Sequence, residues 1–90
     1  MSANRRRVAK SPQCERDLQA IAARHRAEEA IAGFERVVSR IPEMGMAVRG
    51  KQGFYSRPFH TGEGSYLVIY TFDEETVTLV SVRSIPSSSF

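Results

Sequence analysis

Apolar residues follow two different patterns in the two parts of this chain. Before Pro42 they recur every three or four positions, which is the spacing of one face of an α-helix. From Tyr66 to Val82, β-branched and aromatic residues dominate two runs that are joined by an acidic turn. Helices therefore come first and strands last, which predicts an α+β domain with helices on one face of an antiparallel sheet.

The helical part holds two apolar stripes that do not line up. In order, they are Cys14, Leu18, Ile21, Ala22 and His25, then Ala27, Ala30, Ile31, Phe34, Val37, Val38 and Ile41. At about 100° per residue, the stripes would point about 180° apart on one continuous helix. We therefore predict a break near residues 24–27, which folds the segment into a helical hairpin on one sheet. Ser11-Pro12 predicts its start and Pro42 predicts its end near Ile41.

Three strands are predicted to close the chain, and a short edge strand is predicted before the helices. The expected ranges are 5–9 for the edge strand, then 54–60, 65–72 and 76–85. A tight turn at Asp73 would pair Phe72 with Val77 and Tyr70 with Leu79. Continued without interruption, the same register places Ser81 opposite Val68 and Arg83 opposite Tyr66. One side of this meander then carries Leu67, Ile69, Val80 and Val82.

Length and composition narrow the class of protein. Residues 1–90 form a single domain, in which residues 1–3 and 87–90 are expected to be flexible. Thirteen Lys and Arg face ten Asp and Glu, a net charge of +3, and eleven of the thirteen cations are Arg. Arginine suits bidentate contacts to carboxylate or phosphate, so an acidic partner and a compositional bias of the genome are equal interpretations.

Other features indicate a cytoplasmic location. Cys14 is a single cysteine and has no internal disulfide partner. The basic start lacks the apolar segment of a signal peptide, and no run is long enough to span a bilayer. The sequence shows no metal-ligand spacing and no phosphate loop, so we expect neither a metal nor a cofactor and no membrane partner.

Five short motifs then follow one another along the chain. They are Lys10-Ser11-Pro12 with Asp17-Leu18, residues 36–41 with Pro42-Glu43-Met44-Gly45, Ser56-Arg57-Pro58-Phe59, Tyr66-Leu67-Val68-Ile69-Tyr70 and Val80-Ser81-Val82-Arg83. In this order they resemble the RelE/ParE superfamily of bacterial toxins from type II toxin–antitoxin systems. The resemblance implies a β-α-α-β-β-β fold: a short N-terminal strand, a helical hairpin and a three-stranded antiparallel meander.

The resemblance implies two modes of action. Toxins of the RelE branch cleave ribosome-bound mRNA and carry an Arg where this chain has Leu67, together with a C-terminal Arg and Tyr. Here Arg57, His60 and Arg83 are the remaining weak catalytic candidates for acid–base and charge stabilisation. The Tyr-Leu-Val-Ile-Tyr strand is more similar to the ParE branch, whose members poison DNA gyrase without a hydrolytic site.

The leading hypothesis is therefore a growth-inhibiting toxin of the ParE kind, neutralised by a cognate antitoxin in a hetero-oligomer. An mRNA endonuclease and a non-toxic binding module with the same fold are the alternatives. Expected target contacts are Arg49, Lys51, Arg57 and Arg83. Arg49, Lys51 and Arg57 also fit an ordinary solvated loop, and Arg83 also fits a stacked or salt-bridged structural arginine. Interleaved Tyr and Arg suggest an open face lined by tyrosines. In the family the equivalent tyrosines face the helices, which would instead leave Leu67, Ile69, Val80 and Val82 for the antitoxin.

Overall fold

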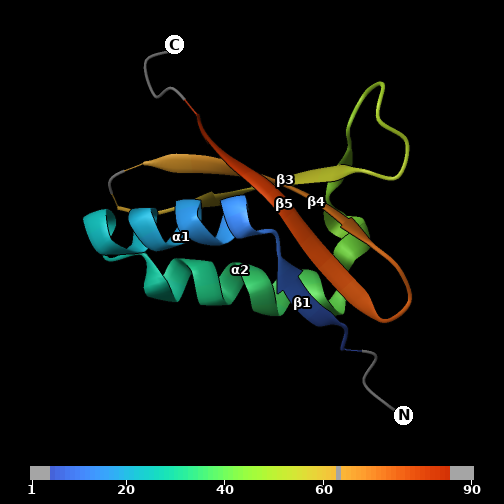
Figure 1. The fold of residues 1–90 in the computed structure, drawn as a ribbon, viewed down its shortest axis with the longest axis horizontal. Helices are drawn as coiled ribbons and strands as arrows, with labels where there is room; N and C mark the ends of the chain where they lie inside the picture. Colours follow the sequence, from blue (N-terminus) through green and yellow to red (C-terminus); the bar gives the residue numbers. More distant parts are fainter. Residues whose placement is uncertain (1–4, 63, 86–90) are drawn as a thin grey trace.

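The protein is described by a computed structural model, which covers residues 5–62 and 64–85. Its elements are β1 (Arg7–Lys10), α1 (Pro12–His25), α2 (Glu28–Arg40), the 3-10 turn η1 (Pro42–Met44), β2 (Met46–Ala47), β3 (Tyr55–His60), β4 (Ser65–Phe72) and β5 (Thr76–Ile85). Figure 1 shows both helices on one side of the sheet, so the α+β class is confirmed. The flexibility expected for residues 1–3 and 87–90 falls outside the described residues.

The sheet is mixed, with strand order β1-β5-β4-β3-β2. The β3-β4-β5 meander is antiparallel, as predicted, and its strands begin and end within one residue of the expected positions. The predicted strand count and order were nevertheless wrong in two respects. β1 pairs in parallel with β5, and β2 adds a fifth strand beside β3. A two-residue strand is too short to show alternation, and parallel pairing between chain ends leaves no local signal.

The helical hairpin forms where the two apolar stripes change phase. Ser11 caps α1 by accepting a hydrogen bond of 3.0 Å from the backbone N–H of Cys14. Arg26 then takes the left-handed conformation, with φ 51°, and this ends α1 two residues before α2 begins. The predicted break and the predicted end of the second helix before Pro42 are both confirmed.

The core lies between the helical hairpin and one face of the sheet. Its buried members are Cys14, Leu18, Phe34, Val38, Phe59, Tyr66, Val68, Tyr70, Val77 and Leu79. Full burial of one such apolar side chain contributes about 1.5–3 kcal/mol. Val37 and Ile41, which the helical stripe had placed in the core, are exposed instead.

A β-bulge divides β5 into two halves. Phe72 lies opposite Val77 and Tyr70 opposite Leu79, as predicted. Beyond them the pairing shifts by one residue at Val80, so Val82 lies opposite Val68. The Ser11 hydroxyl donates a hydrogen bond of 2.8 Å to the Val80 carbonyl and stabilises this irregularity.

The loop after α2 is tied to the sheet through a buried tyrosine. The Tyr70 hydroxyl donates a hydrogen bond of 2.5 Å to the carbonyl of Pro42. A Cβ at Gly45 would lie 2.1 Å from the Tyr70 hydroxyl oxygen and 2.9 Å from the carbonyl oxygen of Ser56. Only glycine therefore fits at this point without displacing the sheet or the tyrosine.

Candidate functional site

The side of the sheet turned away from the helices is the main candidate surface, and we call it the open face. Strand alternation and register place these residues on it: Ser56, Pro58 and His60 from β3, Leu67, Ile69 and Thr71 from β4, and Thr78, Ser81 and Arg83 from β5. Leu67, Ile69 and the bulge residue Val80 are half-buried, and none of them belongs to the core cluster. They form an apolar strip along the middle of the sheet.

Val82 does not belong to this strip. Because the bulge at Val80 adds one residue, Val82 lies opposite Val68 and packs partly against the core, on the helix side. A slip of one residue turns a side chain to the other face of a sheet. The predicted placement of Val82 beside Leu67 and Ile69 was therefore wrong.

The same shift moves Arg83 in the opposite direction. The predicted pairing with Tyr66 was wrong, because Tyr66 lies opposite Ser84 and Arg83 lies opposite Leu67. Arg83 is exposed on the open face, in the same row as Leu67 and Pro58. This row combines an apolar centre with a cationic end.

The three weak catalytic candidates do not converge on one point. Arg57 lies opposite Val68 and so points to the helix side, whereas Arg83 belongs to the open face. His60 is on the open face at the end of β3, where its Nδ1 lies 2.8 Å from the Ser65 hydroxyl. One ring nitrogen is thus engaged in a bond across the β3–β4 pair.

Arg49 and Lys51 lie in the loop between β2 and β3. Backbone hydrogen bonds close this loop, from Val48 N–H to the Phe54 carbonyl at 2.9 Å and from Phe54 N–H to the Lys51 carbonyl at 3.1 Å. The Lys51 ammonium lies 5.9 Å from the centre of the Phe54 ring. The four predicted target contacts are thus divided between a loop, the helix side and the open face.

The tyrosines of the meander face the helices, which is the orientation that the resemblance to RelE/ParE toxins implied. Tyr66 and Tyr70 are buried, and Tyr55 stacks on Tyr70 with ring centroids 6.0 Å apart. Burial raises the pKa of Tyr70, although the Gly45 backbone and the charge of Arg57 act in the opposite direction. A tyrosine-lined surface for stacking on bases is therefore absent from this part of the chain.

Cys14 lies in the first turn of α1 and is fully buried. Burial, with a smaller contribution from the negative charge of Asp17, raises the pKa of its thiol from 9.0 to about 11. The thiol therefore stays protonated near neutral pH and has no nucleophilic role.

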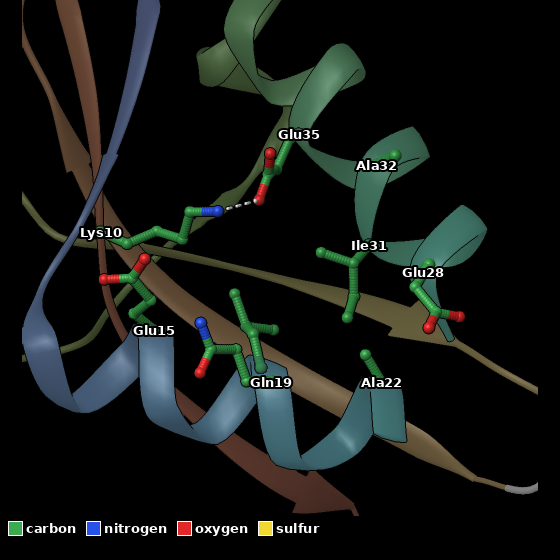
Figure 2. A pocket seen from close by; sticks show the side chains of 9 residues that line it. Lys10, Glu15, Gln19, Ala22, Glu28, Ile31, Ala32 and Glu35 are labelled. Carbon is green, nitrogen blue, oxygen red and sulfur yellow. Dashed lines mark hydrogen bonds and ion pairs between the residues drawn. The ribbon is translucent and has the colours of Figure 1, made fainter. Parts of the chain in front are cut away.

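A cleft of about 250 Å³ lies between the two helices, away from the open face. Figure 2 shows Glu15 and Gln19 on α1 facing Ile31 and Glu35 on α2, with Lys10 reaching across to Glu35. The Lys10–Glu35 ion pair has an N–O distance of 2.9 Å and closes one end. None of the site residues predicted from sequence lines this cleft.

Sequence reasoning also missed Arg6 and Met46. The Arg6 side chain donates to the Asp73 carbonyl at 2.7 Å and stacks over Phe72, so it fastens the N-terminal segment to the β4–β5 turn. Met46 is 75% exposed and lies opposite Ser56, at the edge of the open face. Its position depends on β2, for which the sequence holds no strand signal.

No model of a known protein family matches the chain, and a comparison with curated proteins gives no significant match. Neither helix among the described residues is long and apolar enough to cross a membrane. Within residues 5–62 and 64–85, His, Cys, Asp and Glu side chains do not gather in a group of three that would suit a metal ion.

Proposed function

We propose that this chain is the toxin component of a bacterial type II toxin–antitoxin system, acting by binding an essential target in the manner of ParE toxins. DNA gyrase is the proposed target, and a cognate antitoxin is the proposed neutralising partner. The single observation that carries the proposal is the open face: an apolar strip of Leu67, Ile69 and Val80 beside the exposed Arg83. The helices occupy only the other side of the sheet.

The chemistry of this surface supports binding by a second protein. An amphipathic helix or a strand that covers half-buried aliphatic side chains on a sheet removes apolar surface from water, which favours binding. Arg83 adds a cation that selects a carboxylate on the incoming segment. An apolar strip with one cation suits an acidic, amphipathic antitoxin segment better than it suits bare phosphate.

The arrangement of the catalytic candidates favours the binding mode over the endonuclease. Phosphodiester cleavage needs acid–base and cationic groups on the same reacting phosphate. Arg57 and Arg83 point to opposite faces of the sheet, so these two cannot contact one phosphate together. His60 and Arg83 share the open face and keep the mRNA endonuclease as the second candidate.

Induced expression in bacteria, followed by growth and by two biochemical assays, tests the proposal. We expect growth arrest, inhibition of gyrase supercoiling by the purified protein, and intact ribosome-bound mRNA. mRNA cleavage with normal supercoiling would select the endonuclease instead. Normal growth and neither activity would leave a binding module with this fold.

Two matched pairs of variants locate the surface. Arg83→Ala should weaken inhibition about tenfold, as expected for loss of about 1.4 kcal/mol of contact, while Arg57→Ala should not. Ile69→Asp should abolish rescue by the product of an adjacent short acidic or amphipathic reading frame. Gln19→Asp, at an exposed position in the cleft between the helices and away from the open face, should leave rescue intact. If Arg83→Ala inhibits as strongly as the parent protein, the open face does not bind the target.

A further inference from the structure

The second half of β5 forms a free strand edge in the described part of the chain. β1 pairs with β5 only as far as Leu79. The chain then turns into α1 at Ser11, whose N–H and hydroxyl bond to the carbonyls of Leu79 and Val80. β5 continues to Ile85 with β4 on one side only, and Figure 1 shows this end of β5 running on past β1.

The register identifies which backbone groups face outward on this edge. Leu79 directs its carbonyl away from β4, toward Ser11. The bulge adds one residue at Val80, and N–H and C=O groups then alternate between the two sides of the strand. The groups that point away from β4 beyond the bulge are therefore those of Val82 and Ser84. They are available for the main-chain hydrogen bonds of an additional strand.

A groove lies directly beside this edge, on the helix side of the sheet. It has a volume of about 270 Å³ and is lined by Asp17, Ala20, Ile21, Arg24, Tyr66, Val82 and Ser84. Ile21 and Val82 are half-buried and form its apolar part. A strand added along β5 would direct alternate side chains into this groove, and an aliphatic side chain fits between Ile21 and Val82.

Charge defines the other side chains of the incoming strand. Arg83 is exposed on the open face and Arg24 is exposed at the groove, and the ion pair among the described residues is formed by Lys10 and Glu35 elsewhere. Asp17 already accepts a hydrogen bond of 3.0 Å from Gln13. A second copy of this chain, paired antiparallel about Arg83 at the centre of the free segment, would bring two Arg83 side chains together across the new strand pair, which is unfavourable. An incoming strand in which acidic and aliphatic residues alternate therefore suits Arg83 on one face of the sheet and the apolar groove on the other.

We propose that the edge of β5 from Ser81 to Ile85 binds an extended acidic segment of a partner protein as an additional β-strand. Aliphatic side chains of that segment enter the groove beside α1, and its carboxylates face Arg83. The edge shares Arg83 with the open face but does not include the apolar strip of Leu67, Ile69 and Val80, and the inference holds for any partner that carries such a segment.

A titration of the nitrogen-15-labelled chain with a capped pentapeptide, Glu-Val-Glu-Val-Glu, tests this inference by amide NMR. We expect saturable shifts, largest at the Val82 and Ser84 amides, whose N–H groups become hydrogen-bonded. A peptide with Lys in place of Glu should bind at least about tenfold more weakly, a difference of about 1.4 kcal/mol. Absence of saturable shifts, or equal binding of the two peptides, would overturn the proposal.

Ser84→Pro removes one outward N–H, and proline is tolerated at an edge position that does not bond to the neighbouring strand. We expect it to weaken the acidic peptide about tenfold, whereas Ser84→Ala, which keeps the N–H, should change affinity less than about twofold. Arg83→Glu provides an independent variant if Ser84→Pro alters the β4 amide spectrum, and it should reverse the preference between the two peptides.

If folded Ser84→Pro and Ser84→Ala bind the acidic peptide equally well, backbone pairing does not contribute to the interaction. Sedimentation of the free protein gives a further decisive measurement. We expect a monomer, and a dimer that Ser84→Pro dissociates would show that a second copy occupies the edge instead.

Discussion

The two faces of the sheet are built from the same strands and similar side chains, yet the helices cover only one of them. On the helix side, Val68, Tyr70 and Leu79 have no exposed surface. On the open face, Leu67 and Ile69 remain half-exposed although they alternate with those residues along β4. Hydrophobic character therefore does not decide which residues form the core. The helical hairpin decides it, because it covers only one of the two alternating sets.

The largest expected effect contrasts two leucines on opposite faces. Leu79→Ala removes a fully buried side chain and should lower the free energy of unfolding by about 3 kcal/mol, through lost burial and the cavity left behind. Leu67→Ala, on the open face, should lower it by less than about 1 kcal/mol. Urea unfolding followed by circular dichroism measures both, and equal losses would mean that the open face is covered from within the chain.

The second prediction uses Cys14 to test whether the helix side excludes water. The folded-state pKa of its thiol is about 11, above the usual 9.0, so stability is complete below pH 9 and falls between pH 9 and about 11, as the unfolded thiol ionises first. The expected loss is about 3 kcal/mol, because each of the two pKa units corresponds to about 1.4 kcal/mol. Cys14→Ala removes this contribution, so the difference between its pH profile and that of the parent isolates the cysteine. Parallel profiles would contradict a dry helix side.

The smallest expected effect compares two tyrosines on the helix side. Tyr70→Phe deletes the hydrogen bond to the buried Pro42 carbonyl and should cost about 1 kcal/mol. Tyr55→Phe, whose hydroxyl has no hydrogen bond in the described part of the chain, should change stability by less than about 0.5 kcal/mol. Thermal unfolding of the two variants checks the pair. A loss at Tyr55 that matches the loss at Tyr70 would show that the aromatic stack, rather than the Pro42 bond, is sensitive to hydroxyl removal.

Local patterns in the sequence predicted most of the helices and strands but not how the strand ends pair. The change of stripe phase located the hairpin break, and Ser11-Pro12 located the start of α1, because both signals act within a few residues. The carbonyl of the bulge residue Val80 accepts a hydrogen bond from Ser11, which is far away in the sequence. No alternation along β5 reveals it.

The sheet faces of the candidate residues were predicted correctly before the bulge and wrongly after it. To place Leu67 and Ile69 on the open face, the alternation along β4 was sufficient. To place Val80 there, the alternation along β5 before the register shift was sufficient. Val82 and Arg83 come after the bulge, so their predicted faces were exchanged. The predicted strand 54–60 already contained Arg57 and left Arg49 and Lys51 outside it, but the spacing of these basic residues does not show whether tertiary packing brings them together.

The parallel pairing of β1 with β5 has a consequence for synthesis of the protein. Arg7–Lys10 leaves the ribosome well before its neighbour in the sheet, Thr76–Leu79. The helices can form beforehand, but β1 stays without a partner until translation of β5 is complete, and closing so long a loop slows folding. Nascent chains should thus remain sensitive to proteases until β5 has left the ribosome, and the finished fold should appear only after that point.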